Sequence, residues 1–129
     1  MAFWIMMFAF TLIIPADMVL FGRRFEKKPP EKINYLYGYR TKMACLNENT
    51  WRFAHRKLGE VWQKAGIIML AVTVAYNLFL IGKSEDTVSI AGCVLEVMQV
   101  IAMIFTVLPV ESALRRTFDK NGNKISDEV

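Results

Sequence analysis

The chain has 129 residues, of which 54% are hydrophobic, with a mean hydropathy of +0.29 and a formal net charge of +4. This length allows one modest domain, and the apolar fraction exceeds the roughly 45–50% of a typical soluble domain. The apolar residues gather in three blocks, at residues 1–21, 61–82 and 88–110. Each block is close to the roughly 20 residues needed to cross a bilayer. This segregation argues against a soluble globular domain. We expect a single all-α membrane domain, residues 1–129, with three transmembrane helices.

The basic residues are unevenly distributed along the chain. Ten of the sixteen Lys and Arg residues lie between Arg23 and Lys57, four follow the third block, and Lys83 alone lies between the second and third blocks. By the positive-inside rule we expect the N-terminus outside, with the loop 23–60 and the tail 111–129 in the cytoplasm. Membrane insertion accounts for this asymmetry, so a nucleic-acid partner is the weaker interpretation and is not expected.

The first predicted span covers about residues 2–22. Pro15 is expected to kink it near its cytoplasmic end, because proline removes a backbone hydrogen bond within a helix. Asp17 follows and is interpreted as an interfacial acid that reaches water. The alternative is an ion pair with a nearby base, for which the candidates are Arg23, Arg24 and Lys64.

The loop after this span begins with a charged stretch, residues 23–33, that contains Pro29 and Pro30 and is expected to lie as a linker on the membrane surface. Three tyrosines follow, with a glycine between two of them: Tyr35, Tyr37, Gly38 and Tyr39. Glycine permits a turn with positive φ, and tyrosine favours the head-group layer of a bilayer. The tyrosines are therefore interpreted as an aromatic belt that anchors the loop.

A helix is predicted in the second half of the loop. Asn47 offers a helix N-cap, and apolar or aromatic residues then recur at helical spacing: Trp51, Ala54, His55, Leu58 and Trp62. We expect a cytoplasmic amphipathic helix between the first two spans, lying at the inner interface and leading into span two.

Few residues of the chain are suited to binding a metal ion. His55 is the sole histidine, and on such a helix it is interpreted as a packing or hydrogen-bonding residue rather than a ligand. Cys45 falls in the predicted loop and Cys93 in the third span, so we expect neither a disulfide between them nor a zinc site. No metal or other cofactor is expected.

The second and third spans are predicted at about residues 61–82 and 88–110. The link between them is short, so they are expected to form an antiparallel hairpin. Ala71 and Ala75 form a small-xxx-small pair that is predicted to allow close helix packing. After span three, a short amphipathic helix is expected to end near Gly122.

Polar residues occur inside both spans of this hairpin. On a rise of 1.5 Å per residue, they lie at similar depths and their helix faces can meet. The predicted intramembrane cluster consists of Thr73, Asn77, Glu96 and Gln99. A carboxylate at membrane depth is costly to expose to lipid, so Glu96 should face other helices or water. Two interpretations stay open: polar contacts that hold the helices together, or a site for a ligand, an ion or a proton.

The stretch from residue 34 to residue 59 resembles the SdpI family of bacterial membrane proteins. The residues that match the family's N-x-x-Y-G-Y-R-T pattern are Asn34, Tyr37, Gly38, Tyr39, Arg40 and Thr41. The residues that match the following N, T-W-x-x-A and G positions are Asn47, Thr50, Trp51, Ala54 and Gly59. The tail is also similar to the family, at Glu111, Leu114, Phe118 and Gly122. Ala44 and Cys45 replace a Ser-Met pair that is usual in the family.

The resemblance implies a protein of the bacterial plasma membrane that confers immunity to, or senses, a secreted antimicrobial peptide toxin. It also implies signalling through a cytoplasmic repressor captured at the membrane. The candidate binding surface is the cytoplasmic motif, comprising Asn34, Tyr37, Gly38, Tyr39, Arg40, Thr41, Asn47 and Trp51. Arg40 is the candidate cation for a lipid phosphate or a partner's carboxylate, with an internal role in the loop as its alternative.

Two other functions stay open. A small transporter or channel would use Glu96 and Gln99, and because three helices enclose little space, it would require a homo-oligomer. A membrane assembly or interaction factor is the other possibility. We do not expect an enzyme, because the sequence shows no nucleophile beside a base and no phosphate-binding glycine loop.

Overall fold

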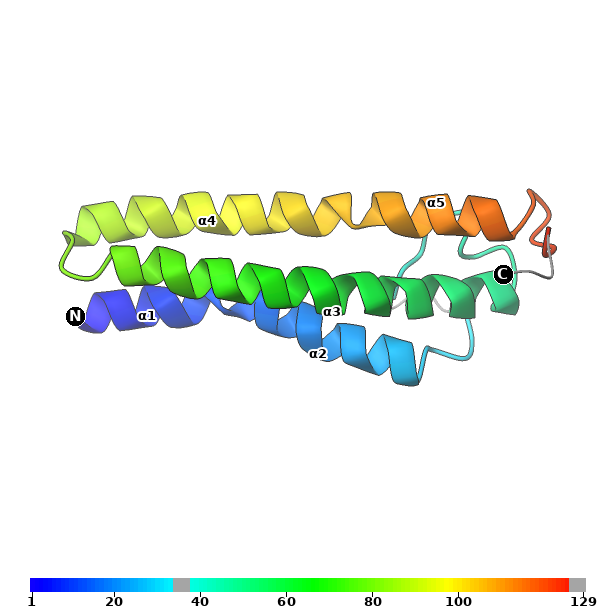
Figure 1. The fold of residues 1–129 in the computed structure, drawn as a ribbon, viewed down its shortest axis with the longest axis horizontal. Helices are drawn as coiled ribbons and strands as arrows, with labels where there is room; N and C mark the ends of the chain where they lie inside the picture. The colour runs from blue at the N-terminus through cyan, green and yellow to red at the C-terminus, as the bar shows by residue number, and fades with distance from the viewer. Residues whose placement is uncertain (34–37, 126–129) are drawn as a thin grey trace.

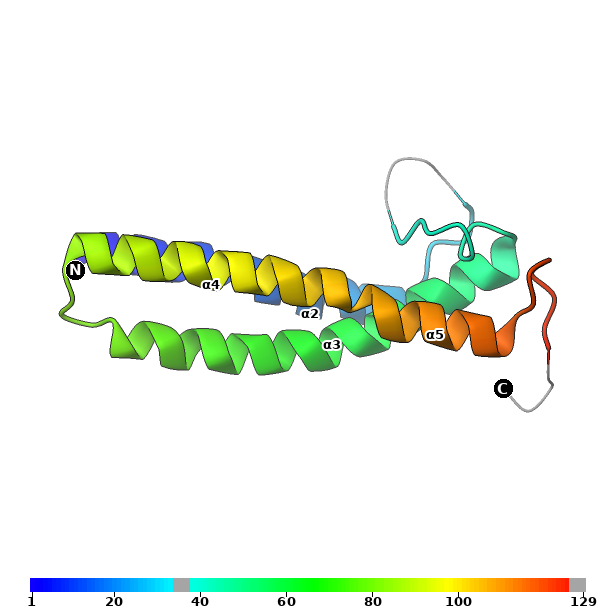
Figure 2. The same cartoon turned by 90° about the horizontal axis from the view of Figure 1, so that it is seen from above.

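The computed structural model describes residues 1–33 and 38–125, so the motif residues Asn34 and Tyr37 lie outside the described residues. The structure is all-helical, as predicted. In chain order, its helices are α1 (Ala2–Thr11), α2 (Ile13–Lys27), α3 (Glu48–Phe79), α4 (Glu85–Phe105) and α5 (Val107–Thr117). α1 with α2, α3 alone, and α4 with α5 form three long rods that run side by side (Figures 1 and 2).

Each rod is long and apolar enough, by length and composition, to cross a membrane. The prediction of three such helices is confirmed. Large apolar side chains cover the outside of the bundle; Phe10, Ile68 and Ile104 are each more than half exposed. A continuous apolar surface of this kind is expected where lipid, rather than water, surrounds a protein.

The predicted amphipathic loop helix is continuous with the second span. Residues 48–60 are the first turns of α3, a single helix of 32 residues. Asn47 caps its start, and no proline interrupts it. The polar and apolar parts of α3 therefore form one rigid rod that joins the loop to the membrane.

Two prolines interrupt the outer rods. Pro15 has no N–H to donate to the carbonyl of Thr11, and the α1–α2 break falls there, at Leu12. The predicted kink is present, but it lies near the middle of the first rod rather than near its cytoplasmic end. Pro109 acts in the same way on Phe105, and the α4–α5 break falls at Thr106.

α2 and α3 cross with their backbones in contact. A Cβ on Gly22 would lie 2.9 Å from the carbonyl oxygen of Gly59, and one on Gly66 would lie 2.8 Å from the side chain of Val19. Real Cβ atoms do not approach so closely, so only glycine fits. The prediction that Ala71 and Ala75 provide the close contact is wrong for the described structure, because both are exposed. The close approach of α2 to α3 therefore requires glycine, and alanine would be too large at these positions.

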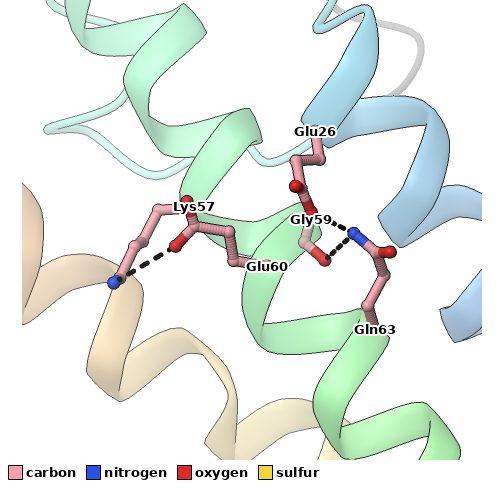
Figure 3. A network of polar contacts seen from close by, with 5 residues as sticks. All are labelled: Glu26, Lys57, Gly59, Glu60 and Gln63. Atoms are coloured by element: carbon pink, nitrogen blue, oxygen red, sulfur yellow. Dashed lines mark hydrogen bonds and ion pairs between the residues drawn. The ribbon is translucent and has the colours of Figure 1, made fainter.

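A polar network lies at the end of this crossing. The amide nitrogen of Gln63 on α3 donates hydrogen bonds to a carboxylate oxygen of Glu26 on α2 and to the carbonyl of Gly59 (Figure 3). Lys57 and Glu60 form an ion pair of 3.5 Å one turn before it. These contacts mark the level at which the apolar rods give way to polar surface.

Candidate functional site

Tyr39 links the loop to two rods at one end of the bundle, which we call the loop end. Its N–H donates to Nε2 of His55 on α3 at 2.8 Å, and its hydroxyl donates to a carboxylate oxygen of Glu111 on α5 at 2.8 Å. The ring is buried. Burial raises the pKa of Tyr39, and the hydrogen bond to Glu111 and its negative charge raise that pKa further, so the hydroxyl keeps its proton.

Gly38 allows this loop to approach α3. Its φ is +104°, a value that favours glycine, and a Cβ there would lie 2.5 Å from Nε2 of His55. Two features therefore require glycine at this position of the Y-G-Y-R-T motif: the positive φ of the backbone and the close approach to His55.

The geometry fixes the tautomer of His55. Nε2 accepts from Tyr39, so the proton lies on Nδ1, which donates to the carbonyl of Trp51 at 2.8 Å. Burial lowers the pKa of His55, although the bond to Trp51 opposes this. These two hydrogen bonds and the burial of the ring favour the neutral form of His55. The interpretation of His55 as a packing and hydrogen-bonding residue agrees with these contacts, but its bond to the motif loop was not predicted.

Asn47 joins the loop, α3 and the tail. Its side-chain oxygen accepts from the N–H of Thr50 at 2.9 Å, and Thr50 Oγ1 accepts from the N–H of Asn47 at 3.0 Å, which completes a capping box. Its amide nitrogen donates to the carbonyl of Gly122 in the tail turn at 2.8 Å. The role of Thr50 could have been found from the N-x-x-T spacing after Asn47.

The remaining motif residues complete one structure at this end. Thr41 accepts a hydrogen bond from the N–H of Ala44 at 3.3 Å, and Trp51 is fully buried. Arg40 is exposed. We call the resulting assembly the loop-end cap, and its members are Gly38, Tyr39, Thr41, Asn47, Thr50, Trp51, His55, Glu111 and Gly122. Within the described part of the motif, these side chains hold the cap together, and Arg40 next to Tyr39 is exposed.

A second polar group lies between the rods. Gln99 on α4 donates from Nε2 to Thr73 Oγ1 on α3 at 2.8 Å and to the carbonyl of Thr11 at 3.0 Å. This is the carbonyl that Pro15 leaves without a helical partner, so the side chain of one rod satisfies the broken backbone of another. Asn77 donates to Thr11 Oγ1 at 3.1 Å.

The predicted polar cluster is thus assembled in part. Thr73, Asn77 and Gln99 meet as expected, and all three are buried, while Thr11 joins them without having been predicted. The signal for Thr11 was its position four residues before Pro15.

Glu96 does not share these hydrogen bonds. It is half-buried, and its Oε1 atom is buried with no hydrogen-bond partner among the described residues. Oε1 of Gln99 is also buried and unpartnered. Among the residues that the structure describes, no group of three His, Cys, Asp or Glu side chains is placed to hold a metal ion.

The family model of the SdpI/YfhL protein family matches residues 31–110, which is more than half of the chain. The chain belongs to this family. The uncharacterized protein YfhL of Bacillus subtilis (strain 168) is similar, with 28% identity over 83 residues, covering 63% of this chain and 73% of that protein. No solved structure gives a significant match.

The range matched by the SdpI/YfhL family model includes most, but not all, of the residues that form the loop-end cap and the polar cluster between the rods. Residues 31–110 include most of the loop-end cap, α3 and α4, whereas α1, α2 and the tail turn lie outside the match. Thr11, Gly22 and Gly122, which each contact a residue inside the match, belong to the outer segments. The matched core is therefore completed by contacts from both ends of the chain.

Proposed function

We propose that this SdpI/YfhL-family protein confers immunity to, or senses, a secreted antimicrobial peptide toxin by binding it at the membrane. Family membership supports the proposal. In the proposed topology the N-terminus lies outside and the loop-end cap in the cytoplasm of a bacterial cell, because ten of the sixteen basic residues lie between Arg23 and Lys57.

The observation that carries the proposal is the connection between the cap and the spans. Tyr39 bonds to α3 through His55 and to the α5 end of the third rod through Glu111. A ligand that binds one arrangement of the rods better than another shifts the protein toward that arrangement. Because both bonds end on the same loop residue, a shift of the third rod against α3 would change the cap. A toxin met in the membrane would thereby alter the cytoplasmic surface.

The exposed surface beside the loop-end cap, at Arg40, is the one proposed for a cytoplasmic repressor. Arg40 is exposed beside the buried Tyr39. Its planar guanidinium is suited to bidentate recognition of a carboxylate. Capture of the repressor would follow from recognition of an acidic side chain at this point.

Challenge of a sensitive bacterial strain with secreted peptides tests the proposal. Cells that produce the protein should survive at least one peptide that kills cells carrying the empty vector. Arg40→Ala should leave the protein folded and in the membrane but weaken protection or repressor capture. Arg116→Ala, which removes an exposed arginine of α5, is the matched control. Survival of the Arg40→Ala cells at wild-type level, with repressor capture intact, would remove Arg40 from the mechanism.

A transporter or channel is the second candidate, and the unpartnered Oε1 atoms of Glu96 and Gln99 favour it. Two buried acceptors without donors are suited to a proton or a cation. A homo-oligomer would then be needed to enclose the pathway. Flux in liposomes that is lost with Glu96→Gln would support this function, and no flux under any ion gradient would count against it.

A further inference from the structure

A groove opens between the rods at the loop end. It has a volume of about 420 Å³ and is lined by residues of α2, of α3 and of the α4–α5 break. Its apolar walls include Phe21, Phe25, Leu58, Ile104 and Val107. Gly38 and Tyr39 of the loop-end cap also line it. The groove is therefore bounded by both the rods and the cap.

The polar side chains of Trp62, Thr106 and Tyr39, which line the groove, are already bonded within the chain. Nε1 of Trp62 donates to Thr106 Oγ1 at 3.0 Å, and Thr106 in turn donates to the carbonyl of Met103. The hydroxyl of Tyr39 is bonded to Glu111. An occupant receives few hydrogen bonds from these walls. A peptide would bring backbone N–H and C=O groups that need partners, whereas a hydrocarbon chain needs none.

The groove is open to the outside of the bundle near the end of the apolar part of α2. Among its lining residues, Phe21 of α2 is 49% exposed and Ile104 of α4 is 61% exposed. Arg24 follows Phe21 by three residues, a rise of roughly 4.5 Å along the helix. An apolar opening is thus followed within one turn by a guanidinium.

Arg24 is the one charged residue that lines the groove among the described residues. Its side chain is exposed and makes no ion pair with a described residue. A guanidinium binds phosphate oxygens in a bidentate manner. The combination of an apolar groove and a neighbouring arginine is complementary to a molecule with a hydrocarbon tail and an anionic head.

We propose that the groove binds one acyl chain of an anionic phospholipid, with the lipid phosphate on Arg24. The site is independent of the proposed toxin, and it adds a lipid of defined charge to the partners of this protein. Because Tyr39 lines the groove, the bound chain would contact the same residue that holds the cap to α3 and α5.

The test measures quenching of Trp62 fluorescence by phospholipids brominated on the acyl chain. The full chain with Trp4→Phe is reconstituted in vesicles of phosphatidylcholine, into which brominated phosphatidylglycerol or brominated phosphatidylcholine is titrated. Trp51 is fully buried and contributes an unquenched background. We expect half-maximal quenching at an about fivefold lower mole fraction of the anionic lipid, as one arginine near the membrane surface would give. Excess inorganic phosphate should not relieve the quenching, because it has no acyl chain.

Three variants separate a groove site from general attraction to charge. Arg24→Gln should abolish the preference for the anionic lipid, whereas Arg23→Gln, at an exposed neighbour that does not line the groove, should retain it. Val107→Phe should fill the groove and reduce quenching by both lipids while Arg24 remains. Circular dichroism checks that each variant is helical, and Ile104→Phe serves in place of Val107→Phe if the latter does not fold.

The proposal is overturned by equal quenching with the two lipids, or by a preference that survives Arg24→Gln. It is also overturned if Trp62 fluorescence in Val107→Phe is quenched as much as in the wild type, since Arg24 would then act without the groove. An apolar peptide can be added to the same vesicles. If it relieves the quenching of Trp62 by both lipids equally, the occupant of the groove is a peptide and not a lipid. None of these outcomes depends on whether the protein protects cells.

Discussion

At the scale of single residues, Tyr39 determines how the loop is held. Its backbone N–H, its ring and its hydroxyl each contact a different part of the molecule: His55, the buried core beside α3, and Glu111. A net hydrogen bond contributes about 1 kcal/mol, more when its partner is charged. We expect loss of one contact to weaken the cap without unfolding the bundle, as the proposed response to a toxin requires.

His55 should make the cap sensitive to acid. Burial lowers the pKa of its ring in the folded protein below the ordinary value of about 6.5, so the unfolded state binds the proton more readily. The histidine's contribution to stability is present above about pH 6.5 and is lost as the pH falls through and below that value. Nε2 would also stop accepting from Tyr39 once protonated.

NMR of the sole histidine, in detergent between pH 4 and pH 8, measures this directly. A pKa clearly below about 6.5 is expected, with loss of protection of the Tyr39 amide over the same range. His55→Gln should reduce the dependence of the melting temperature on pH between the lowered pKa of His55 and about pH 6.5. A ring that titrates at or above the ordinary value would contradict the buried, neutral histidine.

Gly38→Ala should destabilise the cap more than Gly82→Ala. Both glycines have positive φ, +104° and +81°, so alanine is strained at each by about 1 kcal/mol. At Gly38 the new Cβ also meets His55, whereas at Gly82 nothing lies within 4 Å. The expected loss is about 2–3 kcal/mol against about 1 kcal/mol, from unfolding in detergent. Equal losses would mean that the contact with His55 does not matter.

At the scale of elements, glycine and proline set how the rods meet. Gly22, Gly59 and Gly66 bring the backbones of α2 and α3 together, and Pro15 exposes a carbonyl that α4 then binds through Gln99. Association of helices in lipid depends on close packing and on such polar contacts, because burial of apolar surface brings little gain there. The packing of the first rod on the other two follows from these positions.

Gly59→Ala should separate α2 from α3. A Cβ at Gly59 meets the backbone of Gly22 and Glu26, which cannot move aside as a side chain would. We expect a loss of about 1–3 kcal/mol in stability and a longer distance between spin labels on the two helices. Ala71→Leu, at an exposed position of the same helix, should change neither quantity. If Gly59→Ala matched that control, the backbones could not be in contact.

Gln99→Leu should weaken the contact between α4 and the first rod. The change removes the donor to Thr73 and leaves the carbonyl of Thr11 without a partner. Polar contacts between membrane helices average about 0.6 kcal/mol, so a loss of about 1–2 kcal/mol is expected for two bonds. Unfolding in mixed micelles measures it, with Met98→Leu at an exposed site as the control. An unchanged stability would show that the bonds carry little net energy.

At the scale of the whole molecule, the chain has one end with polar surface and a body covered by apolar side chains. The cap, the tail turn and most basic residues lie at the loop end, while the N-terminus and the α3–α4 turn lie at the other end (Figure 1). The proposed topology assigns these ends to the cytoplasm and the outside. The groove opens where the two kinds of surface meet.

The two natural cysteines report on this arrangement. Cys45 is half-buried in the loop, and Cys93 is exposed on the bundle, roughly 12 Å along α4 from Glu85. A membrane-impermeant maleimide should label Cys45 in inverted vesicles but not in spheroplasts. Cys93 should resist labelling in both, because lipid covers it, and react after denaturation. Cys45→Ser and Cys93→Ser identify each signal. Labelling of Cys45 in intact spheroplasts would reverse the topology, and rapid labelling of Cys93 would place it in water.

The helical class and the number of spans can be predicted from the amino-acid sequence, because block length and hydropathy are properties of the chain alone. The capping role of Asn47 and the special status of Gly38 were also evident from local chemistry. The hydrogen-bond partners of these residues were not evident from the sequence. Pairing of Thr11 with Asn77, of Tyr39 with Glu111 and of Asn47 with Gly122 joins positions more than sixty residues apart.

Those pairs are established by the packing of the folded chain, since each depends on the rotation and the crossing of the rods. The choice of Gly22 and Gly59 over Ala71 and Ala75 as the contact shows the reason. Several helix faces carry small residues, and the face that packs is fixed by the fit of backbone against backbone. Hydropathy assigns a helix to the membrane, but the depth and angle at which two helices touch depend on atoms from both.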